Sequence, residues 1–157
     1  MRIADAKPVQ LGHAARADAA WRMYVFADAS TLGFKALAHF LAESEKSPLN
    51  RFTPKGADID SVIDVRGVFQ QGHRDIEVES LPAMLVPRKG RFGLIDYEKA
   101  YSPDLKNGVD IFDLRGINRE LGAIVVVRPD QYVAHVLPLD ATDALTTFFA
   151  QFLVDRH

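Results

Sequence analysis

The sequence contains no cysteine, and this absence removes several classes of function at once. Without thiols the chain forms no disulfide, so a secreted scaffold held together by disulfides is excluded. Catalysis by a thiolate nucleophile, thiol-based redox chemistry and metal sites built from thiolates are excluded for the same reason.

The glycines lack the spacing of a nucleotide-binding loop. No two of the ten glycines lie two residues apart, so the sequence contains no G-x-G-x-x-G fingerprint, and it contains no P-loop. No serine lies in G-x-S-x-G or S-x-x-K, and no two of the five histidines are four residues apart. The sequence therefore predicts no catalytic residue, no cofactor-binding residue and no metal ligand in this chain.

The sequence also lacks an excess of one charge and long apolar runs. The chain has 19 basic and 21 acidic residues, and its formal net charge of −2 favours neither a nucleic acid nor an anionic membrane as partner. No apolar run reaches the ~20 residues of a membrane-spanning helix, and the first residues do not form a signal peptide. We therefore expect a cytoplasmic protein.

The length and composition are those of one globular domain. The 157 residues are 48% hydrophobic and 25% charged, and they contain no repeat, low-complexity tract or flexible linker. A chain of this length buries roughly 68–70% of the surface that its unfolded form exposes, so it needs neither a disulfide nor a metal to fold. We expect a single domain over residues 1–157.

The start of the chain predicts a strand followed by a helix. The β-branched and aromatic run 21–27 is typical of a buried strand. Asp28 or Ser30 is placed to cap a helix, whose apolar residues recur at helical spacing over 34–41. That helix should end before Pro48.

The middle of the chain predicts one more strand and then irregular structure. Residues 61–69 are rich in valine and isoleucine and predict a second strand, with Gly67 as a candidate interruption. Residues 70–110 contain several prolines and glycines, so we expect loops and short helices there. A helical turn is expected at 96–100.

The last third predicts an antiparallel hairpin and a helix. Residues 123–127 and 132–137 read as strands on either side of a turn at 128–131, where proline suits a type I turn. Asp140 is the expected N-cap of the final helix, with Asp143 in its first turn. The apolar stripe of that helix consists of Leu145, Phe148, Phe149, Phe152 and Leu153. At this spacing the three phenylalanines are interpreted as core, or as core plus one interface residue, instead of a ligand site.

The predicted order is strand, helix, strand, irregular region, hairpin and helix. An early β-α-β unit, a terminal antiparallel hairpin and a covering helix give a mixed α/β sheet flanked by helices. The thioredoxin fold has this outline, and the pattern alone leaves other α/β and α+β arrangements open.

Three aspartates near the second strand are candidate ligands for a hard metal ion. Alternation along a strand would place Asp58, Asp60 and Asp64 on one face together with Arg66. The glycine and the distal glutamate of an EF-hand loop are missing. We therefore interpret these residues as a solvated strand face or loop.

Histidine offers one candidate proton-transfer pair, His73 with Asp75. Local hydrogen bonding within a loop is the simpler interpretation of that pair. His135 lies in the predicted hairpin and is interpreted as a satisfied polar group near the core. The remaining histidines are His13, His39 and His157.

Arg128, Pro129 and Asp130 form a charged hairpin tip. Turn chemistry is the first interpretation of this tip, and contact with a neighbouring domain or a phosphate is the second. The densest basic stretch, residues 88–91, is interpreted as a solvated loop.

A valine run followed by Arg-Pro-Asp and Tyr-Val occupies residues 121–134. This run resembles the C-terminal domain of the phenol hydroxylase / 3-hydroxybenzoate 4-monooxygenase family of FAD-dependent aromatic hydroxylases. The other runs that resemble it are residues 6–13, 21–28, 110–117 and 138–143. The resemblance covers nearly the whole chain and is loosest over residues 70–107.

The resemblance implies a thioredoxin-like domain without redox cysteines, in agreement with their absence here. It also implies a homodimer, contacts with the flavin and substrate domains of a parent hydroxylase, and FAD and NADPH as cofactors of that parent. In such enzymes the flavin fingerprint and the catalytic residues lie upstream, so no catalytic or cofactor-binding residue is carried over to this chain. The function implied is that of a non-catalytic assembly and dimerisation domain.

Two other functions stay open. The chain could be a stand-alone thioredoxin-like module that binds a partner protein or a small aromatic, with residues 70–107 lining a pocket. A small oxidoreductase of the thioredoxin or peroxiredoxin type fits the outline but lacks the thiolate nucleophile.

Overall fold

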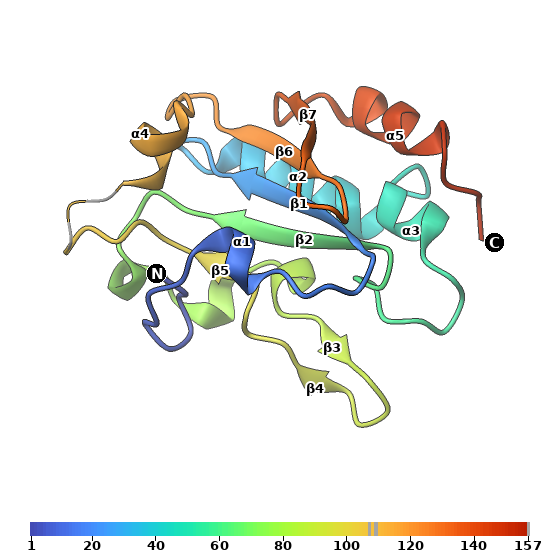
Figure 1. Ribbon diagram of the computed structural model, residues 1–157, viewed down its shortest axis with the longest axis horizontal. Coiled ribbons are helices and arrows are strands. Elements are labelled where there is room, and N and C mark those ends of the chain that lie inside the picture. Colours follow the sequence, from blue (N-terminus) through green and yellow to red (C-terminus); the bar gives the residue numbers. More distant parts are fainter. Residues whose placement is uncertain (107, 109, 157) are drawn as a thin grey trace.

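The computed structural model describes residues 1–106, 108 and 110–156, and a five-stranded mixed sheet runs through their centre (Figure 1). In spatial order the strands are β5 (Ala100–Tyr101), β2 (Ile63–Val68), β1 (Trp21–Phe26), β6 (Ala123–Val127) and β7 (Val133–Leu137). β1 and β2 are parallel, as are β2 and β5, whereas β6 is antiparallel to both β1 and β7. The predicted mixed α/β sheet is confirmed, and the thioredoxin-like outline is compatible with this order.

Helix α2 (Leu32–Glu43) connects β1 to β2 and completes the predicted β-α-β unit. The Asp28 carboxylate accepts hydrogen bonds from the backbone N–H groups of Gly33 and Phe34, at 3.3 and 2.9 Å. The Ser30 hydroxyl donates to Asp28 at 2.5 Å and accepts from the first N–H group of the helix. Both predicted capping residues therefore satisfy backbone donors that the first turn leaves free.

One face of the sheet is covered by helices. α2, α3 (Pro48–Phe52) and α5 (Thr142–Ala150) pack against Met23 and Val25 of β1, and α2 lies behind the sheet in Figure 1. Side chains alternate between the two faces of a strand, so these two residues point to the helices and their neighbours point away. The main hydrophobic core lies between this face and the helices.

The predicted apolar stripe of α5 is confirmed. Leu145 and Phe149 are fully buried, whereas Phe152 is 45% exposed. The Trp21 ring stacks on Phe152, with 4.9 Å between ring centroids, and meets Phe148 and Phe149 edge-on. The phenylalanines are thus core, with one of them at the surface.

The predicted cap of α5 is wrong. The helix begins at Thr142, and Asp140 contributes its backbone carbonyl to the Thr142 N–H group instead of its side chain. Between β7 and α5 lies a turn in which the Ala141 N–H group donates to the Pro138 carbonyl. Because of this turn, the helix begins later in the chain than predicted. Asp143 lies in the first turn, as predicted.

Residues 70–106 are mostly irregular, as predicted. The elements there are the 3₁₀ turns η1 (His73–Asp75), η2 (Val78–Ser80) and η3 (Ala83–Leu85), a small hairpin of β3 (Arg88–Lys89) and β4 (Leu94–Ile95), and β5. The hairpin projects from the body of the molecule in Figure 1, and we call residues 88–95 the hairpin arm.

The helical turn predicted at 96–100 is wrong. These residues lead instead into β5, and the Lys99 carbonyl accepts a hydrogen bond from the Gly67 N–H group at 2.9 Å. The Lys99 ammonium is at the same time drawn into buried ion pairs. Pairing with β2 therefore overrides the local helical preference.

Gly67 does not interrupt the second strand. It lies within β2 and pairs with Val25 on one side and Ala100 on the other. A Cβ atom at this position would lie 2.6 Å from the Leu85 side chain. The glycine therefore makes room for η3 to pack on the strand.

Three short helices have no counterpart in the sequence predictions. These are α1 (Leu11–Ala14), α3 (Pro48–Phe52) and α4 (Ile111–Arg115). Asp110 caps α4 by accepting from the Phe112 N–H group at 2.9 Å, and Gly116 ends it with φ of 63°. Helices this short contain too few residues to show a helical period.

Gly122, just before β6, supports a direct test of backbone packing. Its φ is 64°, and a Cβ atom there would lie 2.4 Å from the Phe26 backbone oxygen. We expect Gly122→Ala to lower the free energy of unfolding by about 3 kcal/mol or more, because the central strand cannot yield. Gly56 has φ of 80° with open space around it, so Gly56→Ala should cost only about 1 kcal/mol. Urea denaturation measures both, and equal losses would contradict the steric argument.

Candidate functional site

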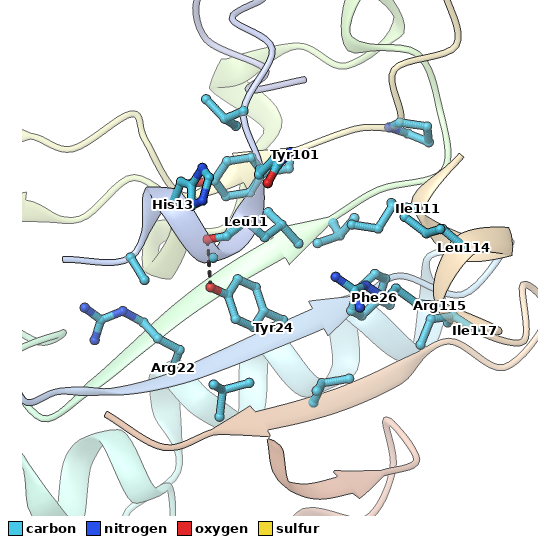
Figure 2. Close-up of a pocket in the computed structure, with 18 of the residues that line it drawn as sticks. Leu11, His13, Arg22, Tyr24, Phe26, Tyr101, Ile111, Leu114, Arg115 and Ile117 are labelled. Carbon is cyan, nitrogen blue, oxygen red and sulfur yellow. Dashed lines mark hydrogen bonds between the residues drawn. The ribbon is translucent and has the colours of Figure 1, made fainter. Parts of the chain in front are cut away.

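The face of the sheet opposite α2 and α5, which we call the open face, carries only short helices in the described residues. β1 presents Arg22, Tyr24 and Phe26 on this face. A hollow of about 910 Å³ lies over these residues, with α1 and α4 as its walls (Figure 2). The sheet thus has one closed face and one face with room for a partner.

The hollow is lined mainly by apolar side chains. The apolar lining includes Phe26, Ile111, Leu114, Val125, Val127, Val133 and Val136. The Tyr24 hydroxyl donates a hydrogen bond to the Leu11 carbonyl at 3.1 Å, which holds α1 against β1 (Figure 2). Because few charged groups reach the hollow, its surface suits an apolar partner better than a charged ligand.

A cluster of buried ions lies beside the hollow, and Asp64 is at its centre. The Asp64 carboxylate pairs with Arg22 Nε at 3.1 Å, with Arg66 Nε at 2.9 Å and with the Lys99 ammonium. All four side chains are buried. We call these four residues the ion cluster.

Further aspartates balance the cations of the cluster. Asp18 accepts a hydrogen bond from Arg22 at 2.7 Å, and Asp60 pairs with Lys99 at 2.5 Å and with Lys89 at 2.8 Å. Lys89 belongs to the hairpin arm. The ion pairs therefore fix the base of the arm to the start of β2.

The pKa shifts in this region all move away from neutral pH. Burial alone would raise the pKa of Asp60, but hydrogen bonds from Lys89 and Lys99 outweigh it and hold the pKa below its ordinary value. Burial raises the pKa of Tyr101 to about 12, although the nearby Arg66 acts in the opposite direction. These two groups keep their protonation states near pH 7, which suits a structural role better than proton transfer.

Of the three aspartates weighed as metal ligands, Asp60 and Asp64 pair with cations, and Asp58 accepts the Gly90 N–H group at 2.9 Å. In the part of the chain that the structure describes, no group of three or more His, Asp or Glu side chains is arranged to hold a metal ion. The interpretation as a solvated face is wrong for Asp64 and Arg66, which are only 4% and 7% exposed. The charged partners that cover them, Arg22 and Lys99, lie far away in the sequence. The local sequence pattern therefore did not reveal this burial. The sequence did contain one signal of a buried charge, which is Arg22, a charged residue inside an apolar strand.

The N-terminus of α2 does not fit the pyrophosphate of a flavin or nicotinamide dinucleotide. In a β-α-β nucleotide site the pyrophosphate lies at the N-terminus of the helix that follows the first strand. At the corresponding end of α2 the Asp28 carboxylate already accepts the N–H groups of Gly33 and Phe34. Its negative charge would repel a phosphate at this position.

The candidate proton-transfer pair is not formed. His73 and Asp75 lie in η1, and no hydrogen bond or ion pair joins their side chains among the described residues. His135 is half-buried and packs against Phe148 with 5.2 Å between ring centroids, which agrees with its predicted place near the core. The other histidines are His13, which lines the hollow, His39, which is exposed on α2, and His157, which lies outside the described residues.

The hairpin tip has the geometry of a three-residue loop. The Gln131 N–H group donates to the Arg128 carbonyl at 2.9 Å, and Gln131 has φ of 68°. A type I turn followed by one left-handed residue is a common hairpin connection. Arg128 and Asp130 pair with each other at 2.5 Å on the surface, with Pro129 between them. Contact of this tip with a neighbouring domain stays a prediction.

Three exposed apolar residues lie on β7 or directly before it, next to this tip. Tyr132, Val133 and Val136 are 72%, 61% and 55% exposed, and we call them the β7 patch. Val133 and Val136 also line the hollow, so the patch continues the apolar surface of the open face. Sequence reasoning missed this patch, although the strand lacks the apolar–polar alternation of a strand with one solvated face.

The ion cluster generates a prediction about stability. We expect Asp64→Asn to lower the free energy of unfolding by about 3–5 kcal/mol, because three buried cations would lose their shared counter-charge. Asp130→Asn removes a charge from an exposed pair and should cost less than about 1 kcal/mol. Urea denaturation of both variants makes the comparison. Similar small losses would show that Asp64 is not the centre of the cluster.

None of the helices in the described ranges has both the length and the apolar character needed to span a membrane.

Comparison with known proteins agrees with the resemblance in the sequence. The family described as "Phenol hydroxylase, C-terminal dimerisation domain" matches residues 1–157. The 3-hydroxybenzoate 4-monooxygenase of Comamonas testosteroni is 55% identical over 159 residues, which cover 98% of this chain and 25% of that protein. The FAD-dependent monooxygenase terD of Aspergillus terreus is 31% identical over 161 residues, with 98% and 26% covered. The chain therefore spans about a quarter of the length of these relatives. Because the family matches it from end to end, the chain belongs to the C-terminal dimerisation domains of the phenol hydroxylase family.

Proposed function

We propose that this chain is a non-catalytic assembly domain that joins two copies of an aromatic hydroxylase about a two-fold axis. The observation that carries the proposal is the apolar open face, continued by the β7 patch, in a member of a dimerisation-domain family. Contiguous exposed apolar surface is typical of protein interfaces, and two-fold homodimers are the commonest oligomers.

The parent enzyme, on this proposal, uses FAD and NADPH to hydroxylate 3-hydroxybenzoate or a phenol. The support is the printed activity of the relative that is 55% identical and the flavin named for the relative that is 31% identical. Both relatives are about four times as long as this chain, which leaves room for flavin and substrate domains. With Asp28 at the end of α2, the cofactors would be held by those domains, and this chain would supply a rigid support.

The assembly role predicts the mass of the purified chain in solution. We expect twice the mass of one chain at micromolar concentration, measured by sedimentation velocity. Because the open face and the β7 patch are apolar, raising the NaCl concentration from about 0.1 M to about 0.5 M should leave the dissociation constant nearly unchanged. A chain that stays monomeric at its highest soluble concentration would refute the dimer and leave binding of a small aromatic in the hollow as the function to test.

The parent activity has a separate test. We expect the reading frame to continue upstream of Met1 into a segment with a G-x-G-x-x-G fingerprint. Its full product should bind FAD and oxidise NADPH when 3-hydroxybenzoate or phenol is supplied, as followed by NADPH absorbance and oxygen uptake. A stop codon directly before Met1 would contradict the proposed role in a hydroxylase, and it would not contradict dimerisation.

A further inference from the structure

We propose that the seam of the dimer is strand β7, paired antiparallel with β7 of the second copy, so that two five-stranded sheets become one continuous sheet. This inference rests on the proposed dimerisation and adds the surface and the geometry through which it occurs. It follows from three features of the described residues: the unequal edges of the sheet, the orientation of the β7 backbone, and the lack of charge in the β7 patch.

The two edges of the sheet differ in how they are covered. At the β5 edge, the N–H group of Ile3 donates to the Ala100 carbonyl, and the Ser102 N–H group donates to Met1, so the first residues of the chain cover it. At the β7 edge, no strand or bridge lies beyond β7 among the described residues. An open strand edge is a template for pairing with another chain unless it is protected.

The backbone of Val136 points to this free edge. The Arg128 N–H group bonds the Tyr132 carbonyl, so the next pair along the antiparallel ladder, Val127 with Val133, is of the non-hydrogen-bonded kind. After the irregularity in the register, Val125 opposite Val136 is again a pair of that kind. The Val136 N–H group accordingly donates to the neighbouring His135 Nδ1 atom, at 3.1 Å, and not to β6.

Pairing about a two-fold axis would place Val136 opposite Val136 of the second copy. If each Val136 N–H group leaves the His135 Nδ1 atom, the two residues exchange both N–H···O=C bonds, with their Cα atoms about 5.5 Å apart. The irregularity lies before His135 and Pro138 follows the strand, so the seam is short and centred near Val136. The two Val136 side chains would then meet on the open face, because Val136 lines the hollow.

The chemistry of the β7 patch allows contact with its own copy. At a two-fold axis each side chain meets itself or a near neighbour, so a charged patch would bring like charges together. The patch consists of one tyrosine and two valines. The nearest charged side chains of the hairpin tip, Arg128 and Asp130, neutralise each other. Neither lysine nor proline lies within β7 to guard the edge.

The hairpin arm is the rival surface, and its charge argues against self-association. Phe92 and Leu94 of the arm are 81% and 69% exposed. Arg88 and Arg91 lie beside them, with Arg91 over the Phe92 ring. Two arms brought together would place these cations against each other, so the arm suits an acidic partner better than a second copy.

Because the chain has no cysteine, single introduced thiols can locate the axis. We expect Val136→Cys to form a disulfide-linked dimer under mild oxidation, since a disulfide needs Cα atoms about 4.4–6.8 Å apart. Phe92→Cys, at a residue even more exposed than Val136, should stay unlinked at the same concentration. Non-reducing electrophoresis separates the two products.

A second pair of variants measures the energetics of the seam. We expect Val136→Lys to raise the dimer dissociation constant by about 100-fold, because two ammonium groups would face each other at the axis. Phe92→Lys should change it by less than about threefold. Circular dichroism and thermal melting check that both variants fold, and Val136→Glu, which also puts like charges at the axis, replaces Val136→Lys if that variant does not fold.

The outcomes separate this inference from the function on which it rests. A native chain that is monomeric at every concentration would overturn both. A native dimer that survives Val136→Lys and leaves Val136→Cys unlinked would overturn the β7 seam while dimerisation stands. Loss of the dimer in Phe92→Lys would assign the interface to the hairpin arm instead.

Discussion

The buried carboxylate of Asp64 fixes the relative positions of segments that are far apart in the chain. Its three cationic partners come from β1, from β2 and from the residue that leads into β5. Arg22 also donates to the backbone carbonyls of Arg16 and Ala20, so the connection between α1 and β1 depends on the same carboxylate. Through Lys99 and Asp60 the ion pairs reach Lys89 and hence the hairpin arm. The base of the open face is therefore held by charge, whereas the opposite face is held by apolar packing.

This division lets one sheet stabilise the fold on one face and expose apolar surface on the other. The helix-covered face contains the larger buried core, with Phe34, Phe149 and Ile124 fully buried or nearly so. The open face keeps only a small buried cluster around Phe26 and Phe112, and it leaves the hollow and the β7 patch exposed. Because packing on the helix-covered face stabilises the fold, the open face can expose apolar surface and the domain still folds. A dimerisation domain needs that separation because its interface must exist before the partner arrives.

The sequence predicted the elements whose signals are local, and it missed those that depend on distant partners. The strand at 123–127, the hairpin and the stripe of α5 follow from side-chain period and turn chemistry, and the structure has them. The helical turn at 96–100 failed because Lys99 is bound by carboxylates from residues 60 and 64. Asp64 was interpreted as solvated because Arg22 is 42 positions away. The β7 patch was missed since exposure of an apolar residue depends on which edge of the sheet its strand occupies, and the sequence does not state that order.

Buried ions are a costly way to hold a scaffold together, and their presence indicates a need for fixed geometry. An apolar replacement of similar volume is often as stable, because desolvation of the charges offsets much of their attraction. Ion pairs differ from apolar contacts in that they are directional, so they hold the segment between α1 and β1 and the hairpin arm at defined positions beside the sheet. Binding costs less when the surfaces are already ordered, since less conformational freedom is lost on association. The Asp64 cluster thus orders the segments beside the open face before any partner binds.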